Sequence, residues 1–231
     1  VRLWTRLPAL AERFWSPDHI TDPADMQARL GSSRRLLASI DIDLAAKRDR
    51  LLERAGLAPT WWPLVEQLEP VKWYGRLLGA EALAARIAGR EMPLARPYQA
   101  DTPLNRVVDA LPPEALGAEG LRALAARALT NLSATATVRG REDESARTAL
   151  SALAISWRDL PSAGTPSELE PVAHALIEVG GIVVDVLEGR ITAAEAQRAL
   201  APLAQPQGEY LLCCVPILVS ALAAQASVGS E

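Results

Sequence analysis

The fold class is decided by residues 26–54, which read MQARLGSSRRLLASIDIDLAAKRDRLLER. A leucine recurs there at every seventh position, as Leu30, Leu37, Leu44 and Leu51. Together with Met26 and Ile40 these leucines form one apolar stripe on a helix of about 3.6 residues per turn. We therefore predict one long helix from about residue 22 to residue 54, stopping at Gly56.

Three charged side chains follow one edge of this stripe. Arg34, Asp41 and Arg48 are spaced at seven-residue intervals, and at about 100° per residue they stay close to the leucines. Charges beside a core-facing surface must be paired or must meet a ligand or partner, because burying them alone is costly. Two interpretations stay open: a structural ion-pair network to a neighbouring helix, or the polar floor of a binding pocket.

A cluster of aromatic residues follows this helix. Trp61, Trp62 and Trp73 lie close together in the sequence, and Arg76 comes shortly after them. Neighbouring side chains on a helix point about 100° apart, so Trp61 and Trp62 cannot both face the same core. Two interpretations of the cluster stay open. Either some of these tryptophans pack in the core and the others are simply exposed, or the cluster lines a ligand pocket or a partner surface.

The rest of the chain is dominated by Ala, Leu and Val and hardly alternates with period two. This pattern predicts an all-α fold, an irregular bundle of about eight helices. Beyond the long helix and short N-terminal segments, we expect helices at about 71–88, 118–138, 142–160, 167–188, 192–203 and 208–226. Thr192 and Glu195 have the spacing of a capping box. The chain is expected to form one domain, 1–231, or two lobes, 1–89 and 118–231, joined by a proline-rich connection at 90–117.

Composition excludes several classes of protein. With 231 residues, 49% of them hydrophobic, and a net charge of −4, the chain is expected to be globular, without the basic surface that nucleic acids require. No apolar run reaches the roughly 18–20 residues of a membrane span. Charged residues interrupt any signal-peptide core near the N-terminus. With a residue bias typical of high-GC genomes, these features favour a cytoplasmic bacterial protein.

Metal and cofactor motifs are also missing from the sequence. His174 has Glu170 and Glu178 one helical turn away on either side, but these positions face away from the apolar side of their helix, so we expect them to be solvated. Cys213 and Cys214 lie in an apolar run and are expected to be buried, reduced thiols. There is no phosphate loop, dinucleotide glycine pattern or nucleophile elbow. We therefore predict neither a metal site nor a cofactor.

The remaining chemistry defines a narrow functional hypothesis. Asp41 would act as a carboxylate base, while the substrate would be held by Arg34, Arg48, Trp61, Trp62, Trp73 and Arg76. This set predicts a metal-independent enzyme of lyase or cyclase type in bacterial biosynthesis. It would act on a small anionic metabolite by elimination, cyclisation or intramolecular displacement, alone or as a subunit of a complex.

The alternative hypothesis is a helical protein–protein interaction subunit, adaptor or immunity-type protein without catalysis. In that case the seven-residue leucine spacing would serve an interface, and the chain would form homo- or hetero-oligomers through its helical faces.

Overall fold

The computed structural model describes residues 7–40, 42–71, 88–90, 106–129, 132, 140–161 and 164–228. Within these residues the chain forms ten α-helices, two 3-10 turns and one two-stranded sheet. The predicted all-α class is therefore confirmed. Among the described residues, no helix has the length and apolar character needed to cross a bilayer.

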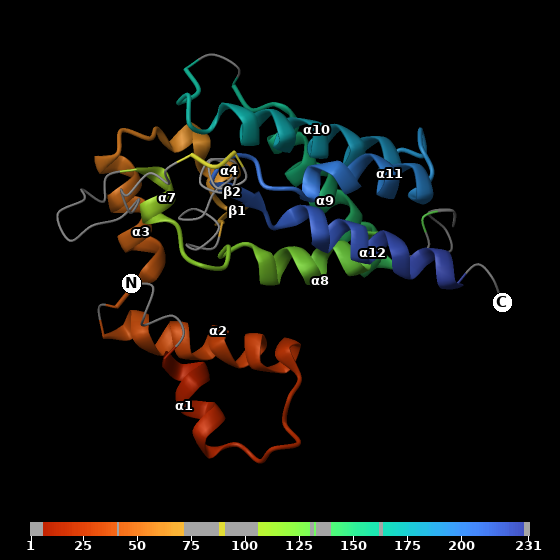
Figure 1. Cartoon of the computed structure of the whole chain (residues 1–231). Coiled ribbons are helices and arrows are strands. Elements are labelled where there is room, and N and C mark those ends of the chain that lie inside the picture. The colour runs from red at the N-terminus through yellow and green to blue at the C-terminus, as the bar shows by residue number, and fades with distance from the viewer. Residues whose placement is uncertain are drawn as a thin grey trace.

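An N-terminal helical hairpin lies to one side of the molecule, below the other helices in Figure 1. It consists of α1 (Leu7–Trp15) and α2 (Pro23–Ser39). The two helices are joined by Arg29 of α2, whose Nε donates to Glu12 of α1 at 2.9 Å. Arg29 also pairs with Asp25 one turn earlier in α2. These contacts hold α1 and α2 together.

The predicted long helix at 22–54 is wrong, because the chain breaks between α2 and α3 (Leu44–Arg54). Asp43 is extended, with φ −83° and ψ 111°, and its carboxylate accepts from the backbone N–H of Ala46 at 3.0 Å. Asp favours such a cap over a helix interior, and the preceding isoleucines lose rotamer freedom in a helix. The leucine stripe is thus divided, and Arg34 and Arg48 lie on different helices.

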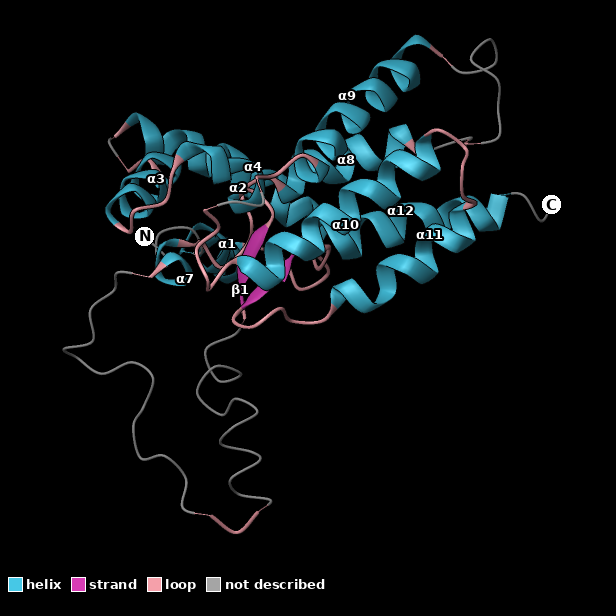
Figure 2. Ribbon diagram, turned by 90° about the horizontal axis from the view of Figure 1, so that it is seen from above, coloured by secondary structure: helices cyan, strands magenta, loops and turns pink. Residues whose placement is uncertain are grey.

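The larger body begins with α3 and a short turn, η1 (Pro59–Trp61), followed by α4 (Trp62–Val65), and α7 (Val107–Ala110) lies beside them. The helices that follow form a bundle: α8 (Ala118–Ala128), α9 (Arg141–Arg158), α10 (Glu170–Leu187), α11 (Ala193–Leu200) and α12 (Cys214–Val228). Figure 2 shows this bundle extending from the end of the molecule occupied by α3 and α4. One core cluster runs through both parts, from Leu52 and Trp61 to Trp157 and Leu222.

The closest packing described is between α9 and α10. A Cβ atom placed on Gly180 of α10 would lie 2.6 Å from the carbonyl oxygen of Ala154 and 2.7 Å from the backbone nitrogen of Arg158. Only glycine fits at that distance, so α10 lies with its backbone against the backbone of α9. A Cβ on the neighbouring Gly181 would meet no atom within 4 Å.

Most of the predicted helices in the C-terminal half are confirmed. The helices expected at 142–160 and 167–188 correspond to α9 and α10. The helix expected at 118–138 begins at Ala118 as predicted but ends at Ala128, so its predicted end is wrong. The capping box is present: Thr192 Oγ1 accepts from the Glu195 amide, and the Glu195 carboxylate accepts from the Thr192 amide at 2.8 Å. These backbone and hydroxyl donors lower the pKa of Glu195. The helix ends at Leu200, and the 3-10 turn η2 (Ala201–Ala204) follows.

The last predicted helix starts later than expected, because residues near 210 form a strand. Strand β2 (Tyr210–Leu212) pairs antiparallel with β1 (Leu68–Pro70), with Leu68 opposite Leu212. Strands of three residues are too short to show an alternating pattern in the sequence. This ribbon brings two segments far apart in the chain together at the base of the bundle (Figure 2). The helix predicted at about 71–88 and much of the 90–117 connection lie outside the described residues.

Candidate functional site

Arg48 is buried, as its place beside the leucine stripe indicated. Its side chain is only 4% exposed. Its Nη2 donates to Glu66 at 2.8 Å, and its Nε donates to Asp49 at 2.8 Å. Glu66 follows α4, so this pair fastens α3 to the segment leading into β1. Both interactions are charge-assisted and neutralise the guanidinium, which is the arrangement of a structural ion-pair network.

Of the other predicted site residues that the structure describes, Arg34 lies on α2 of the hairpin, whereas Trp61 and Trp62 lie in the segment before Glu66, the partner of Arg48. Arg34 lies half-buried on α2, and its Nε is buried with no hydrogen-bond partner among the described residues. Trp61 is 3% exposed and belongs to the core, whereas Trp62 is half-buried and packs against that core. Trp61 and Trp62 therefore differ in burial, as expected for successive residues, whose side chains point in different directions.

Asp41, Trp73 and Arg76 lie outside the described residues, so their roles stay predictions. If Asp41 is a catalytic base, Asp41→Asn should abolish turnover of a small anionic metabolite while the thermal midpoint stays within about 2 °C, since Asn has nearly the same shape as Asp. Turnover is measured by mass spectrometry on candidate metabolites. Activity that survives in the variant would exclude Asp41 as the base.

A second charged cluster joins distant parts of the chain and was not predicted. Arg106, which precedes α7, bonds Glu168 at 3.2 Å and pairs with Glu209. Burial disfavours the charged form of Arg106. The negative charges of Glu209 and Glu168 have the larger combined effect, so the pKa of Arg106 is raised. Tyr210 follows Glu209 and is 1% exposed. Burial and the charge of Glu168 raise the pKa of Tyr210, so its hydroxyl stays protonated. This cluster holds α7, β2 and the start of α10 together.

The histidine-containing triplet on α10 is solvent-exposed, as expected. His174, Glu170 and Glu178 are all exposed. Within the described residues, no group of three potential metal-ligating side chains converges. Cys213 and Cys214 are free and buried, which confirms the prediction of reduced thiols. Burial raises the pKa of Cys213 to about 12 and also raises the pKa of Cys214 well above its usual value, so both are unreactive as nucleophiles near neutral pH.

Large apolar side chains of the α1–α2 hairpin are exposed, and this feature was missed. We call them the exposed hairpin residues: Leu10, Phe14, Trp15, Ile20, Leu36 and Ile40. Phe14 and Trp15 are 84% and 89% exposed, and α1 has no buried residue. The sequence shows that α1 is amphipathic, through Leu7, Leu10 and Phe14, but the pattern alone does not show what covers that face.

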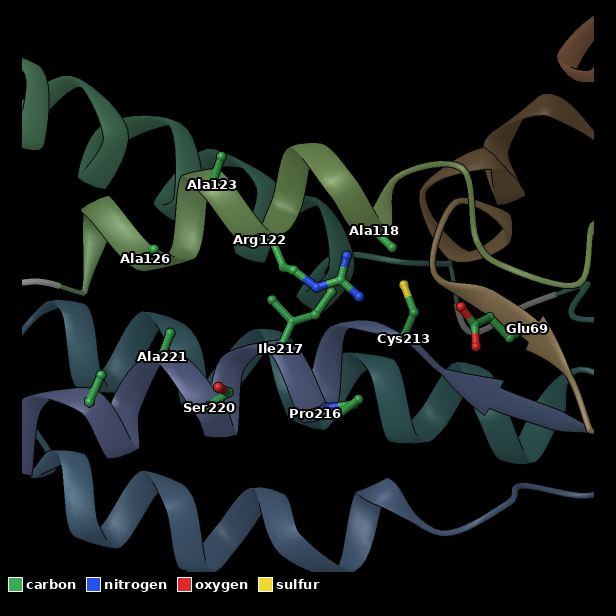
Figure 3. A pocket seen from close by; sticks show the side chains of 11 residues that line it. Glu69, Ala118, Arg122, Ala123, Ala126, Cys213, Pro216, Ile217, Ser220 and Ala221 are labelled. Atoms are coloured by element: carbon green, nitrogen blue, oxygen red, sulfur yellow. The ribbon is translucent and has the colours of Figure 1, made fainter. Parts of the chain in front are cut away.

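Two of the surface cavities are lined by residues that the structure describes. The larger, of about 640 Å³, is a groove between α8 and α12 that ends at Glu69 of β1 and at Cys213 (Figure 3). The smaller, of about 360 Å³, lies between α1 and α2 and includes Glu12, Met26 and Arg29. Among the described residues, the predicted arginines and tryptophans line neither cavity.

The comparisons with known proteins give one likeness of fold. No family model and no curated protein matches the chain. A solved structure of a chitobiase from Flavobacterium johnsoniae is similar, with a TM-score of 0.64 and 21% identity. The likeness covers 95% of this chain and 32% of the chitobiase chain, so this chain spans about a third of that protein's length. At this identity the similarity shows the fold: the helical arrangement described above also occurs as one part of a longer chain.

Proposed function

We propose that this chain is a helical interaction module that docks through the α1–α2 hairpin onto another folded domain, and that this partner is the remainder of a chitobiase-type enzyme. The observation that carries the proposal is the exposure of Phe14 and Trp15, at 84% and 89%. An aromatic side chain buries about 150–250 Å² when it is covered. Two such residues side by side at the end of a short helix are therefore a strong candidate for the centre of an interface.

The ion pairs of the hairpin support this interpretation. Arg29 joins Glu12 and Asp25, so the polar side of the hairpin is satisfied internally. The apolar side has no such partner among the described residues, because α1 contributes no buried residue to the core. A helix held in place by its polar contacts, with aromatic residues left exposed, suits an interface with a hydrophobic centre and a polar rim.

A direct sugar-binding role for these aromatic residues is less consistent with their placement. Phe14 and Trp15 are consecutive residues of α1, so their side chains leave the helix about 100° apart. They cannot form a single flat platform on which a sugar ring would stack. They can instead wrap around a convex feature of a protein partner. The partner class rests on the fold likeness to a third of a chitobiase chain.

The proposal is tested by a binding titration between two purified proteins. The first is this chain, and the second is the catalytic domain of a chitobiase-type enzyme encoded in the same gene or operon. We expect a one-to-one complex, and we expect the double variant F14S/W15S to weaken it by about 1,000-fold, since each central aromatic residue contributes about 2 kcal/mol. The thermal midpoint of the free variant should stay within about 2 °C, because both side chains are exposed.

A matched control separates this effect from a general loss of surface hydrophobicity. Ile155 of α9 is also a large exposed apolar residue, at 37%, but it lies on the main bundle. I155S should bind as tightly as the unmodified chain. Equal affinity for F14S/W15S, or no complex at all, would contradict the proposal. So would binding of chitotriose by the free chain that disappears in F14S/W15S.

A further inference from the structure

The groove between α8 and α12 lies apart from the exposed hairpin residues and calls for its own explanation. Its volume of about 640 Å³ falls in the usual range of small-molecule sites, roughly 300–1,000 Å³. Small side chains from both helices leave this space open, among them Ala118, Ala126, Ala221 and Ala224. Ile217 adds apolar surface to the floor (Figure 3).

Polar groups converge at one end of the groove. In Figure 3 the Arg122 side chain reaches from α8 toward Cys213, with Glu69 on the far side of the thiol. Glu69 accepts from the Ala115 amide at 3.0 Å, and Cys213 contacts the amide oxygen of Gln67 at 3.5 Å. Among the residues that the structure describes, none forms a hydrogen bond or ion pair with Arg122.

This arrangement selects a ligand by charge and by shape. A guanidinium without an ion-pair partner attracts an anion and matches the flat, bidentate geometry of a carboxylate. The nearby carboxylate of Glu69 repels any anion, and it repels a dianion such as phosphate more strongly than a singly charged carboxylate. The thiol of Cys213 is neutral at physiological pH, since burial raises its pKa to about 12. The apolar walls then require an aliphatic or similarly apolar body behind the carboxylate.

We infer that the α8–α12 groove binds an aliphatic carboxylate, with Arg122 pairing with the carboxylate and the chain lying between the alanines of α8 and α12. The part of α12 that lines the groove, from Pro216 to Ala224, extends about 12 Å at 1.5 Å per residue. A ten-carbon chain fits within that length. This site goes beyond the proposed docking function, and neither depends on the other.

The site is tested by calorimetric titration of the purified chain with decanoate, below its micelle concentration. We expect saturable binding of one decanoate. R122Q should weaken it by about 3- to 10-fold, because Arg122 is exposed and water screens its pairing with the carboxylate. Decanol should bind more weakly than decanoate by a similar factor. Ala221→Leu, which fills the groove, should abolish binding while the circular dichroism spectrum is unchanged.

The matched control is Arg127, an exposed arginine on the same helix that pairs with Glu142 outside the groove. R127Q should bind decanoate like the unmodified chain. Equal binding of decanol and decanoate, or an equal loss in R122Q and R127Q, would overturn the inference. Should Ala221→Leu fail to fold, Ser220→Leu, which enlarges an exposed side chain lining the same groove, replaces it. Unchanged decanoate binding in that variant would place the ligand elsewhere and overturn the inference as well.

Discussion

Gly180→Ala is expected to lower the free energy of unfolding by about 2–3 kcal/mol, a typical cost of overpacking a tight core. The added methyl would lie 2.6 Å from the Ala154 carbonyl oxygen and 2.7 Å from the Arg158 amide nitrogen. Both atoms belong to the backbone of α9, so no side-chain rotation relieves the clash. The helices must move apart, and the core residues between them lose contact. Urea unfolding followed by circular dichroism measures the change.

The neighbouring glycine supplies the control. Gly181 is in the same helix, and a Cβ there meets no atom within 4 Å. Because alanine is a better helix former than glycine, Gly181→Ala should raise the free energy of unfolding by about 0.5–1 kcal/mol. The two variants carry the same chemical change one residue apart. Equal stabilities of the two would contradict the close approach of α9 and α10.

The double variant D49N/E66Q is expected to destabilise the chain by about 2–3 kcal/mol. It leaves the guanidinium of Arg48 buried, at 4% exposure, without a charged partner. Removing the partners of a buried charge costs about 3–5 kcal/mol in fully enclosed sites. The value expected here is smaller because Asp49 and Glu66 are about one-third exposed, so water reaches part of the cluster.

Replacing the arginine itself should cost less. Arg48→Met keeps an apolar stem in the core, and the carboxylates that it leaves unpaired, Asp49 and Glu66, are about one-third exposed and can be hydrated, whereas the buried guanidinium cannot. We expect a loss of about 1 kcal/mol or less, and the triple variant R48M/D49N/E66Q should recover most of the stability lost in D49N/E66Q. Urea unfolding of the four proteins forms a thermodynamic cycle. If R48M is as unstable as D49N/E66Q, the burial of an uncompensated charge is not the cause.

The C-terminal helices could be predicted from the sequence because their apolar residues recur with one helical period over several turns. Residues 142–160 and 167–188 carry such patterns and correspond to α9 and α10. The capping box of Thr192 and Glu195 could also be predicted, because its two residues are only three positions apart in the sequence. Features of this kind depend on neighbouring residues, so a single sequence contains them.

The break between α2 and α3 was missed because two local signals competed. The leucine spacing continues through residues 40–43, whereas Asp43 provides a cap that restarts the helix. The cap determines the structure here, and the leucines at both sides of it no longer share one stripe. The pairing of β1 with β2 was missed for another reason: the strands are about 140 residues apart, and nothing in either one indicates its partner.

The candidate site was predicted only in part. The burial of Arg48 followed from its position beside the leucines, but its partner Glu66 lies 18 residues away, beyond the reach of helical spacing. The exposure of Phe14 and Trp15 could not be predicted, because an amphipathic pattern is the same whether its apolar face meets a core or solvent. The role of Arg122 requires knowledge of how α8 and α12 are arranged in space.

The most direct test of the docking claim is amide hydrogen exchange of the chain with and without a saturating amount of the chitobiase-type catalytic domain. Docking through the hairpin predicts that exchange slows by about tenfold or more in α1 and α2, since covered amides open less often. Exchange in α9 and α10, on the main bundle, should stay unchanged. Protection confined to the bundle, with α1 and α2 exchanging as in the free chain, would contradict the account.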